Sequence, residues 1–519
     1  MSESTNLFAE NKSTALRVSV MVAALGLGFI GALLLPASPW GINVFIFTAA
    51  LLGAILFLTR RNQLVLTGGG RWLVFPILLF AALIAWRDSR TLLTANVLAL
   101  LMCLGLAVLR TQRGRLRVAG IVEYVLDWSQ SGFIALLGGA LLLIGTSWRE
   151  VSFGKRAGSA AAVIRGLVIA LPLLLIFGGL FAAADAVFQG LLRQVFNLDT
   201  RTIFDTIGWT LFWSWLVAGF LYALLIYRAP SLLEGLRPAW LALGSIEIGI
   251  VLGLLNALFI AFVIVQVRYF FGGADLVQTT TGLTYAEYAR RGFLELVTVA
   301  ALALPVFLIT HWLSKPNAAR TRKLFNALAV VLIAMLFVIM VSAVQRMSLY
   351  VEVFGLTELR LYTTAFMAWL ALVFIWFMFT VSRGARERFA FGALTLGFGV
   401  LLILNALNPD EVIARTNLNR PNAAEPFDAR YIASLSADAI PTLITALPTL
   451  NQKDVCTITH QIIANRTPPQ EFGVLAPPKG WTWTQPASYD WRTFNLSRTT
   501  AWQITAANWQ TISGACPKN

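Results

Sequence analysis

A run of charged and aromatic side chains at residues 285–295 has the spacing that could bind an anion. Glu287, Arg291 and Glu295 are four residues apart, so on a helix they form a ladder of opposite charges. Glu295 lies in apolar sequence, where a lone carboxylate is costly, and Arg291 is its expected partner. The ladder either fixes a helix end or belongs to a pocket in which arginine binds phosphate or carboxylate bidentately.

Further polar side chains at the ends of other apolar segments extend this candidate site. Asp185 ends one apolar segment, and residues 266–273 (Gln-Val-Arg-Tyr-Phe-Phe-Gly-Gly) end another. We predict that these groups share one side of the membrane, and we name the set the outer pocket. Its predicted ligand-binding residues are Asp185, Gln266, Arg268, Tyr269, Tyr288, Arg290, Arg291, Glu295, Arg346, Tyr350, Glu352 and Arg360.

Known catalytic patterns are missing from the sequence. It has no phosphate loop ending in Gly-Lys-Ser/Thr and no Gly-x-Ser-x-Gly elbow. The two histidines, His311 and His460, are predicted on opposite sides of the membrane and cannot share a metal. Residues 26–31 match a dinucleotide fingerprint without a preceding strand, so we interpret these glycines as a close contact between helices. We therefore predict no catalytic residue, cofactor or metal.

The composition identifies the elements that must position these residues. Of 519 residues, 58% are hydrophobic and 13% are charged, whereas soluble domains are about 45–50% apolar and about 25% charged. The sequence therefore predicts an all-α integral membrane protein. Residues 1–407 hold 31 basic and 17 acidic side chains, and residues 408–519 hold nine and eight. Because the basic excess lies between apolar segments, membrane orientation explains it and nucleic acid is not an expected partner.

Eleven segments (10–12 crossings in all) approach the roughly 20 apolar residues that span a bilayer. With the N-terminus inside, the cytoplasmic segments hold 22 Lys/Arg and the outer loops nine. Cytoplasmic loops carry such an excess, so we predict this orientation, with the C-terminal tail outside. The predicted spans are 17–35, 42–58, 72–86, 92–109, 161–183, 203–227, 246–267, 293–312, 324–344, 361–381 and 390–407.

Residues 118–147 differ from the predicted spans. Their apolar stretch, 133–144, is short for a crossing, and Glu123 and Asp127 precede it. We interpret the segment as interfacial or re-entrant, returning to the cytoplasmic side. The predicted domains are a four-helix membrane segment (1–117), this segment with a basic loop (118–160), a seven-helix core (161–407) and a polar extracytoplasmic tail (408–519).

The tail combines predicted helices with tryptophan and cysteine. Helical patterns cover residues 410–418 and 430–435, and Ser436 reads as an N-cap before 439–447. Its tryptophans are either core residues or interfacial anchors, and they are Trp481, Trp483, Trp491, Trp502 and Trp509.

The three cysteines also bear on the side of the membrane. Cys103 lies in an apolar segment and is expected to be a packing residue. Cys456 and Cys516 are both in the tail, and we predict a disulfide between them, the alternative being two separate buried thiols. Because disulfides persist in oxidising compartments, this prediction agrees with a tail outside the cytoplasm.

Four ordered stretches resemble a bacterial membrane family catalogued as domain of unknown function 4173 (DUF4173). They are residues 184–188, 266–273, 285–293 and 350–360, and residues 408–441 resemble the continuation usual in that family. The resemblance covers roughly residues 160–450. It implies a multi-pass bacterial protein with no established activity, so it implies no catalytic residues.

Three functions are compatible with these observations. We expect first a non-enzymatic sensor, scaffold or regulator in the bacterial inner membrane. It would contact the lipid bilayer, an envelope protein through residues 408–519, and an anionic ligand through the outer pocket. The alternatives are a transporter of an anionic or amphiphilic solute, or a lipid-linked transferase with an extracytoplasmic site. Such a transferase would use Asp185, Glu287 or Glu295 as its acid or base.

Overall fold

The elements described by the computed structural model are all helices. It describes residues 2–64, 71–113, 121–146, 177, 185, 200–227, 243–271, 293–313, 319–380, 383, 388–420, 428–466 and 490–516. By contacts these residues fall into two compact units. Unit 1 comprises residues 1–78, 104–114 and 128–228, and unit 2 comprises residues 79–103, 115–127 and 229–519. The predicted domain boundaries remain predictions, and each unit is described separately.

Within the described residues, eight helices have the length and composition needed to cross a membrane. The protein is therefore a multi-pass membrane protein. Three further helices contain shorter apolar stretches, and they are α3 (Arg71–Trp86; stretch Trp72–Trp86), α5 (Ile121–Ile144; stretch Gly132–Ile144) and α12 (Phe293–Leu313; stretch Glu295–His311). Of the predicted span at 161–183 only residue 177 is described, so eleven crossings remain a prediction. The eight long helices are α1 (Ser2–Leu34), α2 (Ile42–Arg61), α4 (Arg90–Arg113), α8 (Thr200–Leu225), α9 (Ser245–Phe271), α13 (Ala319–Phe354), α14 (Glu358–Thr380) and α15 (Phe389–Leu407).

In unit 1, glycines allow the helices to approach closely. A Cβ atom on Gly28 of α1 would lie 2.6 Å from the backbone nitrogen of Ser214 in α8. A Cβ atom on Gly138 of α5 would lie 2.7 Å from the Cα atom of Gly219, also in α8. The interpretation of residues 26–31 as a helix contact is thus confirmed for Gly28 and Gly31 but not for Gly26, which has no neighbour within 4 Å. Small side chains let membrane helices pack backbone to backbone.

Helix α5 covers most of the segment predicted to be interfacial or re-entrant. It runs without a break from Ile121 to Ile144, a length of about 36 Å at the usual rise per residue. Its apolar part packs along α8, where the Trp215 indole donates a hydrogen bond to the Leu136 carbonyl at 2.8 Å. This continuity favours an interfacial or a crossing helix over a segment that turns back within the membrane.

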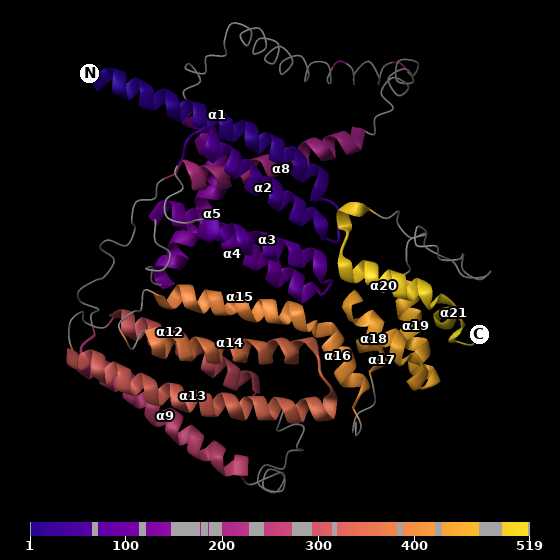
Figure 1. The fold of residues 1–519 in the computed structure, drawn as a ribbon. Coiled ribbons are helices and arrows are strands. Elements are labelled where there is room, and N and C mark those ends of the chain that lie inside the picture. Colours follow the sequence, from indigo (N-terminus) through magenta and orange to yellow (C-terminus); the bar gives the residue numbers. More distant parts are fainter. Residues whose placement is uncertain are drawn as a thin grey trace. The chain divides into compact units, whose positions relative to one another are not determined.

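In unit 2, contacts fix the relative directions of the membrane helices. α9 and α13 run parallel, because Gly249 lies near Leu324 and Asn256 donates to the Leu328 carbonyl. α13 and α14 form a hairpin across the turn at residues 355–357, and α15 packs along α14 (Figure 1). Their buried side chains, with those of α12, form one continuous apolar core.

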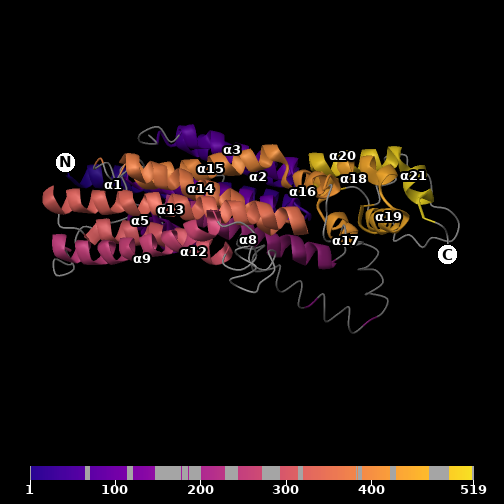
Figure 2. The ribbon, with the colours of Figure 1, turned by 90° about the horizontal axis from the view of Figure 1, so that it is seen from below.

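The helix ends of unit 2 therefore separate into two groups. One group lies on the side from which the tail helices continue (Figure 2), and it comprises the end of α3, the start of α4, the α13–α14 turn and the end of α15. At the opposite end lie the start of α13 and the link between α14 and α15, which carry Arg320, Arg322, Lys323, Arg383 and Arg388.

The tail forms a helical module with its own apolar core. The predicted helices at 410–418, 430–435 and 439–447 are confirmed, although Ser436 caps a 3-10 turn that precedes the last of them. The tail elements are α16 (Pro409–Leu418), α17 (Ala429–Ala433), η4 (Ala437–Ala439), α18 (Ile440–Ala446), η5 (Leu447–Thr449), α19 (Gln452–Arg466), η7 (Trp491–Thr493), α20 (Leu496–Ala507) and α21 (Trp509–Gly514).

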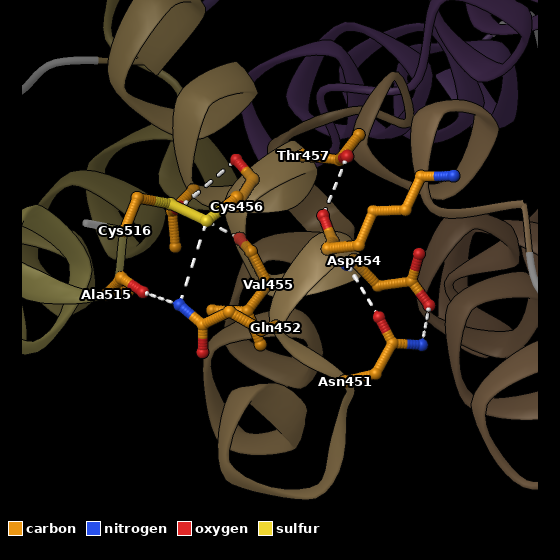
Figure 3. The surroundings of a disulfide bond; sticks show 10 residues. Asn451, Gln452, Asp454, Val455, Cys456, Thr457, Ala515 and Cys516 are labelled. Atoms are coloured by element: carbon orange, nitrogen blue, oxygen red, sulfur yellow. Dashed lines mark hydrogen bonds between the residues drawn. A yellow bond between two sulfur atoms is a disulfide. The ribbon is translucent and has the colours of Figure 1, made fainter. Parts of the chain in front are cut away.

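Cys456 and Cys516 connect α19 with the residues that follow α21. Their sulfur atoms are joined, with Cα atoms 5.3 Å apart (Figure 3), a separation that a disulfide spans. Beside them the Gln452 amide donates to the Ala515 carbonyl at 2.5 Å. The bridge in the cell remains a prediction, because the redox state of the compartment decides it. Cys103 is buried, as expected of a packing residue.

Replacing Gly28 with leucine should destabilise unit 1, because the new side chain would overlap the backbone of α8. Overpacking of this kind costs about 1–3 kcal/mol, which should appear as a lower midpoint of thermal unfolding in detergent or nanodiscs. Gly26→Leu is the matched control, since a Cβ atom on Gly26 has no neighbour within 4 Å. Equal midpoints for the two variants would contradict the close approach.

Candidate functional site

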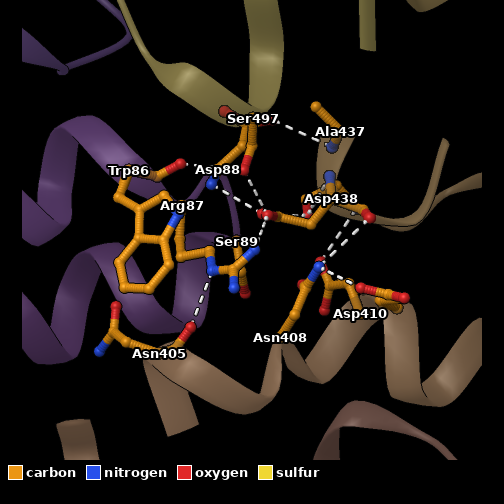
Figure 4. A network of polar contacts seen from close by, with 12 residues as sticks. Trp86, Arg87, Asp88, Ser89, Asn405, Asn408, Asp410, Ala437, Asp438 and Ser497 are labelled. Carbon is orange, nitrogen blue, oxygen red and sulfur yellow. Dashed lines mark hydrogen bonds and ion pairs between the residues drawn. The ribbon is translucent and has the colours of Figure 1, made fainter. Parts of the chain in front are cut away.

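The strongest polar cluster in unit 2 lies where the link between α3 and α4 meets the tail (Figure 4). Helix α3 ends at Trp86 and α4 begins at Arg90, so the link is the short sequence Arg-Asp-Ser. Ser89 is buried, and its carbonyl accepts the first hydrogen bond of α4 from Leu93 at 2.8 Å. We name this link and its tail partners the junction.

Arg87 connects the junction to the end of α15. Its Nε donates to the Asn405 carbonyl at 2.8 Å, and Nη2 lies 3.4 Å from the Ala406 carbonyl. Nη1 forms an ion pair with Oδ1 of Asp438 at 3.2 Å. The last carbonyls of a helix have no partner within the helix, and a cation there interacts favourably with the helix dipole. One guanidinium thus caps α15 and holds the tail.

Asp438 binds the backbone of Asp88, and Asp88 binds the backbone of Ala437, the residue before Asp438. The Asp88 backbone N–H donates to Oδ2 of Asp438 at 2.8 Å, and the Ala437 N–H donates to Oδ2 of Asp88 at 3.1 Å. Asp88 also forms an ion pair with Arg498 of α20 at 2.9 Å. Two chain segments far apart in sequence are therefore joined by reciprocal, charge-assisted hydrogen bonds, which are stronger than neutral ones.

The side chain of Asp438 is only 1% exposed. Besides Arg87 and Asp88, its carboxylate accepts hydrogen bonds from the hydroxyls of Ser497 at 2.5 Å and Ser436 at 3.2 Å. A buried charge is tolerated when it is paired and hydrogen-bonded, and Asp438 meets both conditions. Its partners come from the α3–α4 link, η4 and α20, so this carboxylate is the centre of the junction.

Helix α20 also binds the end of α3 directly. The side chain of its N-cap, Asn495, donates to the carbonyls of Ile84 at 3.0 Å and Arg87 at 2.9 Å. The Ser497 hydroxyl lies 2.9 Å from the Trp86 carbonyl. These contacts satisfy carbonyls that the last turn of a helix leaves without partners. The start of α20 is thereby fixed at the end of a membrane helix.

Asp410 lies at the start of α16, one residue after the α15–α16 joint. Asn408 is in the left-handed region (φ 56°), which Asn tolerates well, and Pro409 begins the helix. Asp410 is fully buried, and its Oδ2 accepts from the Ser436 N–H at 3.1 Å. Its Oδ1 accepts no hydrogen bond from the described residues. Burial, and then the nearby charges of Glu358 and Asp438, raise the pKa of Asp410 to about 6.

A second set of contacts joins the tail to the α13–α14 turn. Gly355 has φ +80°, and a Cβ atom there would collide with Asn417 of α16. The Asn417 side chain accepts from the Leu356 N–H at 3.0 Å and donates to the Leu356 carbonyl at 2.8 Å. The Tyr431 hydroxyl accepts from the Glu358 N–H at 2.9 Å. The tail therefore holds both the α3–α4 link and the α13–α14 turn.

The structure brings only part of the predicted outer pocket together. The Arg360 guanidinium lies 4.0 Å from the ring centroid of Tyr350 and donates to the Gly355 carbonyl. Glu352, Glu295 and Asp185 are exposed, and Arg346 is half-buried. The outer pocket remains a prediction, because Tyr288, Arg290 and Arg291 lie outside the described residues, as do the side-chain positions of Gln266, Arg268 and Tyr269.

The junction is not among the sites predicted from the sequence. Arg87 and Asp88 occur in a loop of three residues, and Asp438 lies two residues after the predicted N-cap Ser436. The available signal was a pair of opposite charges in a very short link between apolar segments, where a charge needs a partner. No sequence pattern indicates that the partner of Arg87 is 351 residues away.

Residues 74–446 match a family described as a domain of unknown function (DUF4153). The match covers more than half of the chain, so the protein belongs to this family. The predicted resemblance to DUF4173 is therefore wrong in the specific family, whereas a multi-pass membrane family of unknown function is compatible with the match. The matched range includes Arg87, Asp88 and Asp438 but ends before α20. No curated protein and no solved structure matches the chain.

Asp438→Ala should release the tail from the membrane helices. It removes the buried partner of Arg87, and breaking a buried ion pair in this way costs about 3–5 kcal/mol. Limited proteolysis of the full chain in nanodiscs should then cut the tail faster than in the wild type. Arg415→Ala is the control, because its i,i+4 pair with Glu411 is exposed and is worth about 0.3–0.5 kcal/mol. Equal cleavage rates in the two variants would contradict the junction.

The burial of Asp410 predicts a pH dependence of tail stability. Its folded-state pKa of about 6 lies above the ordinary value of 3.8, so the folded state binds the proton more tightly. The stabilisation of the folded state that comes from protonated Asp410 is fully present below about pH 4 and is lost as the pH rises through about 6. It amounts to at most about 3 kcal/mol. The midpoints of thermal unfolding of the wild type and Asp410→Asn should diverge between pH 5 and 8, with the variant more stable at pH 8. Midpoints that change in parallel with pH would refute the raised pKa of Asp410.

Proposed function

We propose that this DUF4153 member is a non-enzymatic sensor, scaffold or regulator of the bacterial envelope that acts through its tail. The observation that carries the proposal is the junction, in which Arg87, Asp88 and Asp438 tie the tail to the ends of α3, α4 and α15. Charge-assisted contacts of this kind hold a folded module in a defined position. A module held in this way can present a surface to a partner.

The distribution of charge supports a tail outside the cytoplasm. Among the described residues, the end of unit 2 opposite the tail carries five basic side chains in α13 and the α14–α15 link. Cytoplasmic ends of membrane helices carry such an excess. The joined Cys456 and Cys516 agree with an oxidising compartment on the tail side. We therefore propose the bacterial inner membrane, with the N-terminus in the cytoplasm.

Contacts to several helix ends also suggest how a signal would pass through the protein. The tail binds the α3–α4 link through Asp438 and the α13–α14 turn through Asn417. A partner that binds one position of the tail more tightly than another favours that position, and both contacts change with it. The shift can be no larger than the difference in the partner's binding free energy for the two positions. The outer pocket residues Tyr350 and Arg360 lie on the helices of that same turn. We propose that an anionic ligand there acts on the same contacts.

A thiol reagent that cannot cross membranes tests the location of the tail. In spheroplasts, Cys456 and Cys516 should react only after mild reduction, because oxidation protects them and the outside medium reaches them. Cys103 is buried and should stay unlabelled. Labelling that requires lysis would place the tail in the cytoplasm and overturn the proposed orientation.

The same cells test the proposed role. A membrane-impermeant amine cross-linker should join an envelope protein to the wild-type tail and to Arg415→Ala. Asp438→Ala should lose this product while remaining in the membrane, since the variant keeps its membrane helices but not the position of its tail. A product that persists equally in Asp438→Ala, or cellular function that survives deletion of residues 408–519, would refute the role of the tail.

A further inference from the structure

The surface of the tail has one apolar corner. Among the described residues after Leu407, Trp491 and Leu496 are the large hydrophobic side chains that stand exposed, at 56% and 49%. Both lie at the start of the α20 region, in η7 and in the first turn of α20. The described remainder of the tail keeps its large apolar side chains at least partly buried, so this exposure is local and needs a cause.

The corner is held at the level where membrane helices end. Leu496 stands between Asn495 and Ser497, whose side chains bind the carbonyls of Ile84, Trp86 and Arg87. α4 begins at Arg90, and α15 ends at Leu407. Because these helices are long and apolar enough to span a bilayer, the membrane surface passes through this level.

The neighbouring membrane helices present the same kind of side chain here. Trp86, in the last turn of α3, is 37% exposed, and Leu407, at the end of α15, is 57% exposed. Tryptophan is enriched at the boundary between lipid headgroups and hydrocarbon, because the indole ring is amphipathic. Arg87 stacks on the Trp86 ring at 4.5 Å, an arrangement that suits a polar–apolar boundary.

We propose that the η7–α20 corner is a membrane-interface anchor, in which Trp491 and Leu496 insert into the headgroup region of the bilayer beside Trp86. The tail is then held by two kinds of contact, the polar junction to the helix ends and an apolar contact to lipid. The partner is the lipid bilayer itself, because the apolar surface of the corner continues that of the membrane helices.

With this anchor, the described tail tryptophans divide between core residues and interfacial anchors. Trp509 is buried in the tail at 9% exposure and acts as a core residue. Trp491 belongs to the interface. Trp502 is half-buried, and Trp481 and Trp483 lie outside the described residues.

Spin labels on the full chain in lipid nanodiscs test the anchor. Leu496→Cys and Trp491→Cys carry the label at the corner. Gln503→Cys is the matched control, exposed on the same helix and about 10 Å further along its axis. The unsubstituted chain, kept oxidised, gives the background labelling. Accessibility to oxygen, which concentrates in lipid, is compared with accessibility to a water-soluble nickel chelate.

The anchor predicts a higher oxygen-to-nickel ratio at 496 and 491 than at 503. In detergent-free nanodiscs the EPR spectrum of the label at 496 should also be broadened by spin-labelled headgroups. Three results would overturn the proposal: a nickel-dominated ratio at both corner positions, equal ratios at 496 and 503, or low accessibility to both reagents. The last of these would show that protein, rather than lipid, covers the corner. Thermal unfolding of each labelled variant confirms that it folds like the parent chain.

Discussion

A carboxylate almost without access to water must be surrounded by donors, and the arrangement around Asp438 follows from this constraint. A buried charge that is not compensated costs several kcal/mol. The donors that compensate Asp438 come from the α3–α4 link, from η4 and from α20. Satisfying one side chain therefore fixes three elements relative to each other. The membrane core of unit 2 is ordinary apolar packing, whereas the position of the tail depends on this charge.

The joint between α15 and α16 adds a second constraint on the tail. Only Asn408 separates the two helices, and its left-handed backbone sets the angle between them. The side chain of Asn408 donates to the Glu411 carboxylate at 2.9 Å, which links the joint to the first turn of α16. With Arg87 on the carbonyls at the end of α15, the transition from membrane helix to tail has polar partners on both sides.

The sequence allowed the apolar helices and the early tail helices to be predicted, because both have local signals. A span shows as a hydrophobic run, and Ser436 shows as an N-cap. The junction has no local signal: Arg87 and Asp438 gain their meaning only when the chain brings them together. The outer pocket was inferred from residue types near helix ends, and of its members Tyr350 and Arg360 are seen in contact. The predicted family, DUF4173, is wrong because short aromatic and arginine motifs do not distinguish two families of multi-pass proteins.

The separation of 351 residues between Arg87 and Asp438 has a consequence for how the protein is made. At a synthesis rate of about 5–20 residues per second, the α3–α4 link waits roughly 20–70 seconds for its partner. During that time Arg87 and Asp88 stand at the end of inserted helices before the tail residues that bind them have been made. The junction forms only after Asp438 and Arg498 have been synthesised, so the positioning of the tail is a late step of folding. A chain cut before Asp438 keeps the residues of its membrane helices but lacks the carboxylate that pairs with Arg87.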